Sequence, residues 1–477
     1  MISKKRTDAL LAMIRKKQEM TGRQKFNLIV WLAIPSVLAQ VTSVLMFYID
    51  AAMVGALGAE ASASIGLVES TTWLFGSLTG AAAMGFSVQA AHFIGANDFE
   101  RARQVFVQGL MATGILTVFL TAVCLAIADP LPHWLGGGSD ITRNASLYFA
   151  IYSMALPIFQ FGVLSSSMLK SSGNMRVPSF ISLLMCLLDV VFNFLLIFPT
   201  RTLTLWGIDF QMPGAGMGVA GAALGTALAY LVTGILLIRA AVFKSPEISL
   251  RYRQLSLKPQ WGYLHNALKI SGPMAAQHIM MGGAQIVSTM IVAPLGNFAI
   301  AANTFAITAE SLCYMPGIGI GEAATTLVGQ SNGAGRYALC RSFAYKTVFL
   351  GMAVMAMMGI VMYIAAPDMI GIMSPVEEIR RLGTSALRIE AFAEPMFAAA
   401  IVCYSIFVGA GDTLIPACMN LGSMWLVRLT LAASLAPKYG LNGVWFAMAV
   451  ELTFRGSIFL VRLFRGKWMK MRGLPTD

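Results

Sequence analysis

The sequence predicts an all-α membrane protein with twelve transmembrane helices, arranged in two homologous six-helix lobes. Three observations support this fold class: an apolar composition, twelve apolar segments of membrane-spanning length, and an internal repeat with a constant offset. Hydrophobic residues make up 57% of the 477 residues and charged residues only 12%, about half the charged share of an ordinary soluble domain. Most of the chain is therefore expected to lie in a lipid bilayer.

Twelve segments of about 20 or more residues are apolar enough to cross a bilayer. They are 27–53, 62–88, 104–128, 144–169, 177–199, 215–240, 265–292, 299–328, 342–366, 382–408, 414–436 and 440–464. They divide the chain into a basic N-terminal tail (1–26), a first lobe (27–240), a linker (241–264), a second lobe (265–464) and a C-terminal tail (465–477). The six cysteines lack metal-ligand spacing and are interpreted as small apolar residues, neither disulfides nor zinc ligands.

The 34 Lys and Arg residues orient the spans. With the N-terminus inside, 27 of them, Arg455 included, fall on one face and six on the other, while Arg428 lies within a span. Because cytoplasmic loops are enriched in Lys and Arg, both termini and the linker are predicted to be cytoplasmic. The net charge of +12 then lines the cytoplasmic rim, where it meets anionic lipids. Membrane lipids are expected partners, and nucleic acid is not.

From Pro35 to Pro178, the first half of the chain is repeated in the second at a constant offset, without gaps. The pairs that show it are Pro35 and Pro273, Gly58 and Gly296, Gly95 and Gly333, Pro157 and Pro395, and Pro178 and Pro416. Six spans per half is an even number, so the halves share one orientation and are related by an axis along the membrane normal. This arrangement favours transport by rocking around a central cavity. The alternative is a duplicated bundle that transports nothing.

The first lobe contains two aspartates within apolar spans. Asp50 lies in span 1, and Asp189 lies in span 5 with Asn193 one turn later on the same helical face. Loss of hydration favours the protonated form of a buried carboxylate, so such a group can carry protons. We hypothesise that Asp50, Asp189 and Asn193 form a cation-coupling site, with Gln40 and Tyr48 as helpers. The alternative is that the aspartates are neutral, hydrogen-bonded structural groups.

The second lobe has charged residues at similar depth. Counting residues from the span ends places Glu310, Glu394, Glu451 and Arg428 near mid-membrane. Because buried charges pair, Arg428 and Glu451 are predicted to form a structural ion network. Glu310 and Glu394 either bind a cationic substrate or a second proton, or belong to that network. Glu322 lies near the cytoplasmic end of span 8 and is expected to be a gate or a rim residue.

In their order along the chain, these motifs resemble the multidrug and toxic compound extrusion (MATE) family over essentially the whole length. The motifs are the proline and Asp50 of span 1, the Gly95-Ala96 turn, SSGNMRVP, NFLLIF, TTLVGQSNGAGR, GAGDTLIP, WLVR and the terminal GKW. The resemblance implies a V-shaped, two-lobed exporter without a cofactor, which exchanges organic, often cationic, compounds for protons or sodium. It also implies a bacterial or archaeal cytoplasmic (inner) membrane. A monomer is expected.

The resemblance implies that the span 1 aspartate and an Asn-x3-Asp pair in span 5 form the cation site. Asp50 matches, but Asp189 stands where the family has Asn, and Asn193 where it has Asp. Some members also carry a glutamate two turns after the proline of span 7, where this chain has the stretch around Gln277. The retained carboxylates favour proton coupling. Sodium at Asp50, Asp189 and Asn193 is the alternative, because their oxygens suit a hard cation.

Two other functions receive less support from the sequence. A lipid or glycan flippase would need a wide basic cavity, and only Arg428 and Arg388 lie at depth. An intramembrane aspartyl protease would need two facing aspartates in their motif. The GAGD at 409–412 repeats SSGN at 171–174 and is expected in a cytoplasmic turn. A transporter of small organic compounds, not an enzyme, is therefore the preferred interpretation.

Overall fold

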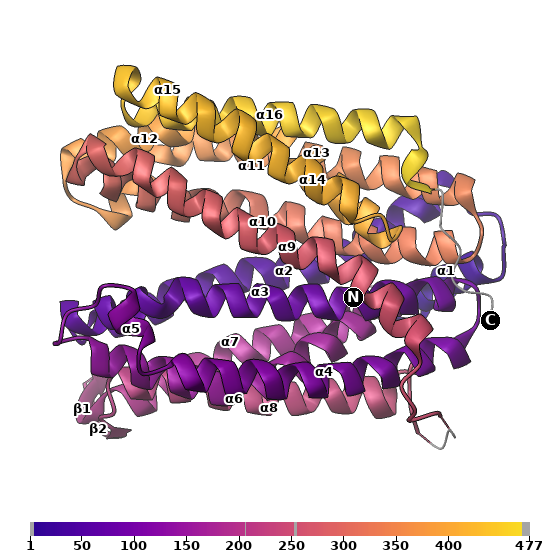
Figure 1. Ribbon diagram of the computed structural model, residues 1–477, viewed down its shortest axis with the longest axis horizontal. Coiled ribbons are helices and arrows are strands. Elements are labelled where there is room, and N and C mark those ends of the chain that lie inside the picture. The colour runs from indigo at the N-terminus through magenta and orange to yellow at the C-terminus, as the bar shows by residue number, and fades with distance from the viewer. Residues whose placement is uncertain (1–3, 206, 252–254, 470–477) are drawn as a thin grey trace.

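A computed structural model describes residues 4–205, 207–251 and 255–469. Residues 1–3 and 470–477, which belong to the two predicted tails, lie outside the described residues. Figure 1 shows long helices that run roughly side by side in two consecutive groups, the indigo-to-magenta helices of the first half and the orange-to-yellow helices of the second.

Six long helices form the first lobe within the described residues. They are α2 (Gly22–Gly55), α3 (Ala59–Gly95), α4 (Phe99–Ile127), α6 (Thr142–Ser171), α7 (Arg176–Ile197) and α8 (Val219–Arg239). Short elements join them or follow: α5 (Leu131–Trp134) and the π-helical turn η1 (Ala240–Lys244). A capping box begins α2, since the Thr21 side chain accepts from the Gln24 N–H and the Gln24 side chain accepts from the Thr21 N–H.

The loop between spans 5 and 6 folds as a β-hairpin, which an all-α prediction did not include. Strand β1 (Pro199–Leu205) pairs antiparallel with β2 (Ile208–Ala215). The reason is local: residues 202–205 alternate threonine with leucine, the period-2 pattern of a strand. The hairpin lies at the end of the molecule opposite α1 (Lys4–Arg15), so it caps the end predicted to be outside.

The second lobe repeats the first in its helix boundaries. Helix α10 (Asn297–Gly333) has the same length as α3, and both of its ends are displaced from those of α3 by the repeat offset that separates Pro35 from Pro273. Its other elements are α9 (Trp261–Val292), η2 (Ala293–Leu295), α11 (Tyr337–Met373), α12 (Glu377–Ala391), α13 (Glu394–Gly409), α14 (Leu414–Gly422), η3 (Ser423–Arg428), α15 (Leu429–Tyr439), α16 (Leu441–Arg465) and η4 (Lys467–Met469).

Two predicted spans of the second lobe are not continuous α-helices. Span 10 breaks into α12 and α13, which bend by 62° between Ala391 and Glu394. Pro395 lies in the first turn of α13, and proline is tolerated there because the first N–H groups of a helix have no intrahelical partner. Span 11 contains the π-helical turn η3, which ends at Arg428. Such turns frequently occur at functional sites.

Nine helices of the described chain are long and apolar enough to cross a membrane, and the bent pair α12–α13 makes a tenth span. The remaining two of the twelve predicted spans are α3 and α10, each 37 residues long. They are rich in Gly, Ala, Ser and Thr, and each carries two glutamates, which lowers their hydropathy. Small residues are favoured where helices approach closely inside a membrane bundle, and these two helices lie at the contact between the lobes.

The lobes touch where glycines allow the helix backbones to meet. A Cβ atom on Gly95 would lie 2.0 Å from the Gln330 carbonyl oxygen, and one on Gly319 would lie 2.6 Å from the Val37 nitrogen. His92 of α3 adds a hydrogen bond across the interface, with Nε2 2.8 Å from the Gly409 oxygen. Because no side chain fits at these positions, the contact depends on glycine.

Helix α1 packs beneath both lobes at this same end of the molecule. Leu11 fills the space beside Gly173 of the first lobe, and Arg336 of the second lobe donates to the Met13 carbonyl at 3.1 Å. Arg15 pairs with Glu247 of the linker at 3.6 Å. The predicted N-terminal tail thus contains a helix that contacts both lobes and the linker.

Candidate functional site

Three polar side chains meet inside the first lobe. The Asn193 side-chain nitrogen of α7 donates to Asp50 Oδ1 of α2 at 3.1 Å and to Asp189 Oδ2, one turn earlier, at 3.3 Å. Asp189 and Asn193 are fully or almost fully buried, while Asp50 is partly exposed. The structure therefore brings together the three residues that the sequence singled out as a cation-coupling site.

The cluster keeps unused acceptor oxygens. Asp189 Oδ1 and Asn193 Oδ1 are buried without a hydrogen-bond partner. Gly225 of α8 leaves room for the amide, since a Cβ atom there would lie 2.1 Å from Asn193 Oδ1. Thr226 of α8, which the sequence pattern did not single out, also interacts with the Asp189 carboxyl group. Buried acceptors that lack a donor favour a proton or a cation between them.

Gln40 and Tyr48, the two suggested helpers, are placed differently. Gln40 lies ten residues before Asp50, about 15 Å along the helix, and donates to Glu322 at 3.1 Å. Tyr48 is two residues from Asp50, and residues with this spacing do not face each other on a helix. The structure thus gives Gln40 a role in the contact between the lobes.

Glu322 links the lobes in a small charged cluster. Its Oε1 lies 2.7 Å from Lys170 Nζ of α6 and accepts from Gln40 of α2, so one carboxylate of the second lobe contacts two helices of the first. Both charged side chains are about one-quarter exposed. Nearby, Thr326 donates to the Lys170 carbonyl and Gln330 to the Ser171 carbonyl. Glu322 is thus an interface residue at the end where the lobes touch.

The second lobe buries a group of acids around the bend of span 10. Glu390 lies in the last turn of α12, Glu394 begins α13, and Glu310 faces them from α10. All three are buried, and neither oxygen of Glu390 or of Glu394 has a well-aligned hydrogen-bond partner. The break between α12 and α13 brings two carboxyl groups of one segment close to Glu310. Glu390 is an addition to the residues found from the sequence.

Arg428 and Glu451 lie in a second polar group on the other side of Glu310. Glu451 accepts from Arg455, one turn later on α16, at 2.7 Å and from the Ser423 hydroxyl at 2.5 Å. Arg428 lies close enough to Glu451 and Glu310 to interact electrostatically. A cavity of about 230 Å³ opens between Glu310, Arg428 and Arg455. The charge pattern of the sequence grouped Arg455 with the cytoplasmic charges, whereas the structure buries it beside Glu451.

These clusters consist mainly of carboxyl, amide and guanidinium groups. Within the described residues, no group of three or more His, Cys, Asp or Glu is placed to hold a metal ion. The cluster around Asn193 offers two carboxylates and an amide oxygen on two helices. Such a site can exchange a small cation without any covalent step.

The MatE family profile matches residues 35–195 and again residues 273–433. The chain belongs to the MatE family. The second match begins and ends at the repeat offset from the first, which confirms the internal repeat. The resemblance to this family predicted from the sequence is confirmed, and the MatE chain is a transporter and not an enzyme.

Among curated relatives, a probable multidrug resistance protein NorM of Thermotoga maritima is 26% identical over 451 residues, 94% of each chain. Solved structures share the fold. An outward-facing multidrug resistance MATE family transporter aligns with a TM-score of 0.86 at 20% identity, over 96% of this chain and 98% of that one. A MOP superfamily transporter from Pyrococcus furiosus aligns at 0.85 and 19%, over 97% and 98%. The twelve-helix, two-lobed membrane architecture of the MatE chain is thereby confirmed.

Proposed function

We propose that this MatE-family transporter exports small organic, often cationic, compounds in exchange for protons. It works by alternating access between the two lobes, as a monomer in a prokaryotic cytoplasmic membrane with both termini in the cytoplasm. The curated relative of Thermotoga maritima is a probable multidrug resistance protein, which supports organic substrates. The excess of Lys and Arg on one face supports the orientation.

The observation that carries the proposal is the pairing of Asp50 and Asp189 through one amide. Two carboxylates that share the Asn193 donor repel each other unless a proton or cation neutralises part of their charge. Within the described residues, neither aspartate forms an ion pair with Lys or Arg. The neutralising charge must then come from outside the protein, which is what coupling requires.

The exchange works if proton binding and substrate binding compete. Asp50 is partly exposed while Asp189 is buried, so Asp50 is the group that meets a substrate first. A proton arriving at the pair removes the charge that holds an organic cation, and the cation is released. Loss of the proton restores that charge and the affinity for the next substrate.

The conformation fits an outward-facing, V-shaped transporter. The contacts between lobes around Gly95, Gly319 and Glu322 lie toward the end predicted to be cytoplasmic. The opposite halves of α2, α3 and α9 carry exposed apolar side chains, among them Phe47, Trp73 and Met290. A central cavity that opens outward between the lobes would explain this exposure. Substrate release to the outside is the step that such a state performs.

Transport by purified protein in liposomes tests the proposal. The liposomes contain a fluorescent organic cation, and a pH gradient or a sodium gradient is imposed separately. Wild type, Asp50→Asn and the control Glu60→Gln, which removes an exposed acid from the same lobe, are compared. We expect pH-driven export by wild type and control, and none above background by Asp50→Asn.

Each other outcome changes a different part of the proposal. Export driven only by sodium would keep organic substrates and replace the coupling ion. Unchanged pH-driven export by Asp50→Asn would remove the coupling role of the aspartate. No export under either gradient, by protein that is folded, would overturn drug export, and lipid substrates would then be tested.

A further inference from the structure

A separate pocket of about 540 Å³ lies between α11 and α12, at the end of the second lobe that is predicted to be outside. Its lining includes Tyr363, Arg380, Arg381, Thr384, Arg388 and Phe392. It shares no lining residue with the cavity that contains Glu310 and Arg428. Nothing in the coupling mechanism uses it.

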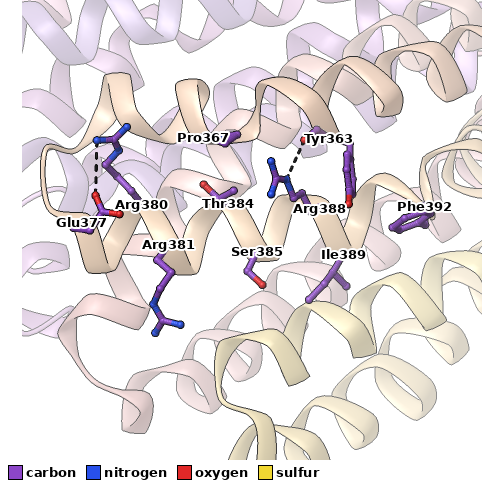
Figure 2. A pocket seen from close by; sticks show the side chains of 10 residues that line it. All are labelled: Tyr363, Pro367, Glu377, Arg380, Arg381, Thr384, Ser385, Arg388, Ile389 and Phe392. Atoms are coloured by element: carbon purple, nitrogen blue, oxygen red, sulfur yellow. Dashed lines mark hydrogen bonds and ion pairs between the residues drawn. The ribbon is translucent and has the colours of Figure 1, made fainter.

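The basic side chains of the pocket are ordered by the helix. Arg380, Thr384 and Arg388 are spaced by four residues, so they form one row on α12, and Figure 2 shows this row directed toward α11. Arg381 points away from α11 on a neighbouring row. The Arg380 guanidinium lies against the α11 backbone, since a Cβ atom on Gly371 would be 3.0 Å from its Nη2.

The positive charge in this row is only partly neutralised. Glu377 is 3.9 Å from Arg380 and is 89% exposed, a geometry that gives little binding energy in water. Arg388 lies over the Tyr363 ring, 5.2 Å from its centroid, and donates from Nε to the Tyr363 carbonyl at 3.1 Å. Its two terminal nitrogens have no partner within the described part of the chain. The stacked, anchored guanidinium therefore presents a preformed fork of donors.

Beyond the deep end of the pocket, exposed apolar side chains cover the surface of α11 and the bend after α12. Phe392 is 79% exposed, and Ile360 and Ile364 of α11, one turn apart, are 63% and 70% exposed. In a membrane-spanning lobe such a face contacts lipid. Arg380 and Arg388 are about 12 Å apart along the helix axis. From the outer end inward, the pocket presents the partly exposed Arg380, then the anchored Arg388, then apolar side chains. This is the order of headgroup, phosphate and acyl chain in a phospholipid.

We propose that this pocket binds the phosphate of an anionic phospholipid of the outer leaflet. The phosphate oxygens accept from the anchored Arg388 and from the Thr384 hydroxyl, the headgroup beyond the phosphate lies toward Arg380, and an acyl chain lies along Phe392 and Ile364. Guanidinium and phosphate form short, charge-assisted, often bidentate hydrogen bonds. One Glu and three Arg line the pocket, so an anionic headgroup is preferred to a zwitterionic one. The assignment to the outer leaflet depends on the proposed orientation of the chain in the membrane, whereas the assignment to an anionic phospholipid does not.

The test measures lipid retention by the full-length protein in detergent. Phosphatidylglycerol, phosphatidylcholine and inorganic phosphate are titrated separately, and bound molecules are counted by native mass spectrometry. The variants are the double substitution Arg380→Gln with Arg388→Gln and the control double substitution Arg143→Gln with Lys438→Gln. The control removes the same two positive charges from exposed positions at the end predicted to be outside, and neither residue lines the pocket. Thermal unfolding in phosphatidylcholine reports whether each variant is folded.

We expect wild type to bind phosphatidylglycerol at least about tenfold more tightly than phosphatidylcholine, and the double variant to lose that preference. The Arg143→Gln and Lys438→Gln control should keep it. Equal binding of the two lipids by wild type, or equal losses in the double variant and the control, would overturn the proposal. So would inorganic phosphate that binds as tightly as the lipid, since the site would then be one for a free anion. If the double variant does not fold, the single variants Arg380→Gln and Arg388→Gln replace it, and each is expected to weaken the preference for phosphatidylglycerol because each removes one positive charge from the pocket.

Discussion

The two lobes repeat each other in backbone but not in charge. At the repeat offset, Asp50 corresponds to Ser288 and Asp189 to Val427. In the other direction, Glu394 of the second lobe corresponds to Leu156 of the first. The helices, by contrast, keep equivalent ends, as α3 and α10 do. Duplication thus explains the scaffold, while each lobe has its own polar interior.

The two interiors differ in the source of the positive charge that neutralises their carboxylates. Within the described residues, the pair Asp50–Asp189 shares an amide and no built-in cation. The second lobe holds Arg428 and Arg455 among its acids, and Glu451 is bonded to Arg455. A site without its own cation must take one from solution, whereas a site with one can be structural. The comparison therefore predicts that the first lobe couples transport and that the ion pair of the second stabilises the fold.

The largest effect is expected from the aspartates of the first lobe. Asp189→Asn, like Asp50→Asn, should reduce pH-driven export by about 100-fold or more, because the remaining carboxylate loses the repulsion that makes the pair bind a proton. Its free energy of unfolding should change by no more than about 1 kcal/mol, since no buried cation loses a partner. The measurements are liposome transport and chemical unfolding in detergent. A strongly destabilised Asp189→Asn would instead point to a structural role for this aspartate.

Substitution of Glu451, the acid that pairs with Arg455 in the second lobe, should show the opposite pattern, with a loss of stability but not of coupling. Glu451→Gln leaves Arg455 buried and unpaired, and breaking a buried ion pair costs about 3–5 kcal/mol. We expect a lower free energy of unfolding, with the coupling ratio retained in whatever protein folds. Ser423→Ala, which removes only the hydroxyl bonded to Glu451, is the milder control. A stable Glu451→Gln that no longer couples would move ion exchange into the second lobe.

The sequence predicted the parts of this fold that depend on composition and spacing. The twelve spans follow from their apolar length, and the repeat follows from glycines and prolines at one offset. Asp50, Asp189 and Asn193 could be found because ionisable groups are rare in apolar segments. The three side chains meet because α2 packs against α7 and because Gly225 leaves space beside Asn193. Neither feature was evident from the spacing of the residues alone.

The sequence could not predict features that depend on which helices face each other. Gln40 is on the same helix as Asp50, yet only the packing of α2 against α10 makes it a partner of Glu322. Arg455 is one turn from Glu451 within α16, and only the packing of α16 shows that its guanidinium is buried beside Glu451 and does not reach the cytoplasmic rim. Glu390 was missed because the bend between α12 and α13, which turns it inward, has no pattern in an apolar segment.

A variant that exchanges the two span 5 residues sharpens the comparison between this chain and its family. Asp189→Asn combined with Asn193→Asp restores the family order and moves the carboxylate one turn, about 5.4 Å. Position 193 already contacts Asp50, so a carboxylate there still forms the pair. We expect pH-driven export within about tenfold of wild type. Export at background, with both single variants also inactive, would show that the depth of the carboxylate and not only its presence is required.

The smallest effect is expected at the contact between the lobes. Glu322→Gln breaks the ion pair with Lys170, and a partly exposed pair of this kind contributes up to about 1 kcal/mol. Because the pair joins the lobes, its loss should favour the state in which the cytoplasmic end opens. The Thr326 hydroxyl donates across the interface, so a cysteine placed there would be alkylated only when the lobes part.

Alkylation is measured in Thr326→Cys protein that also carries Cys418→Ser, which removes the exposed cysteine of the described chain. Adding Glu322→Gln should raise the labelling rate up to about fivefold, the change that about 1 kcal/mol gives in a two-state equilibrium. Glu378→Gln breaks a surface ion pair with Arg381 on the same lobe and should leave the rate unchanged. Equal rates with and without Glu322→Gln would mean that the glycine contacts, and not the charged cluster, hold the lobes closed.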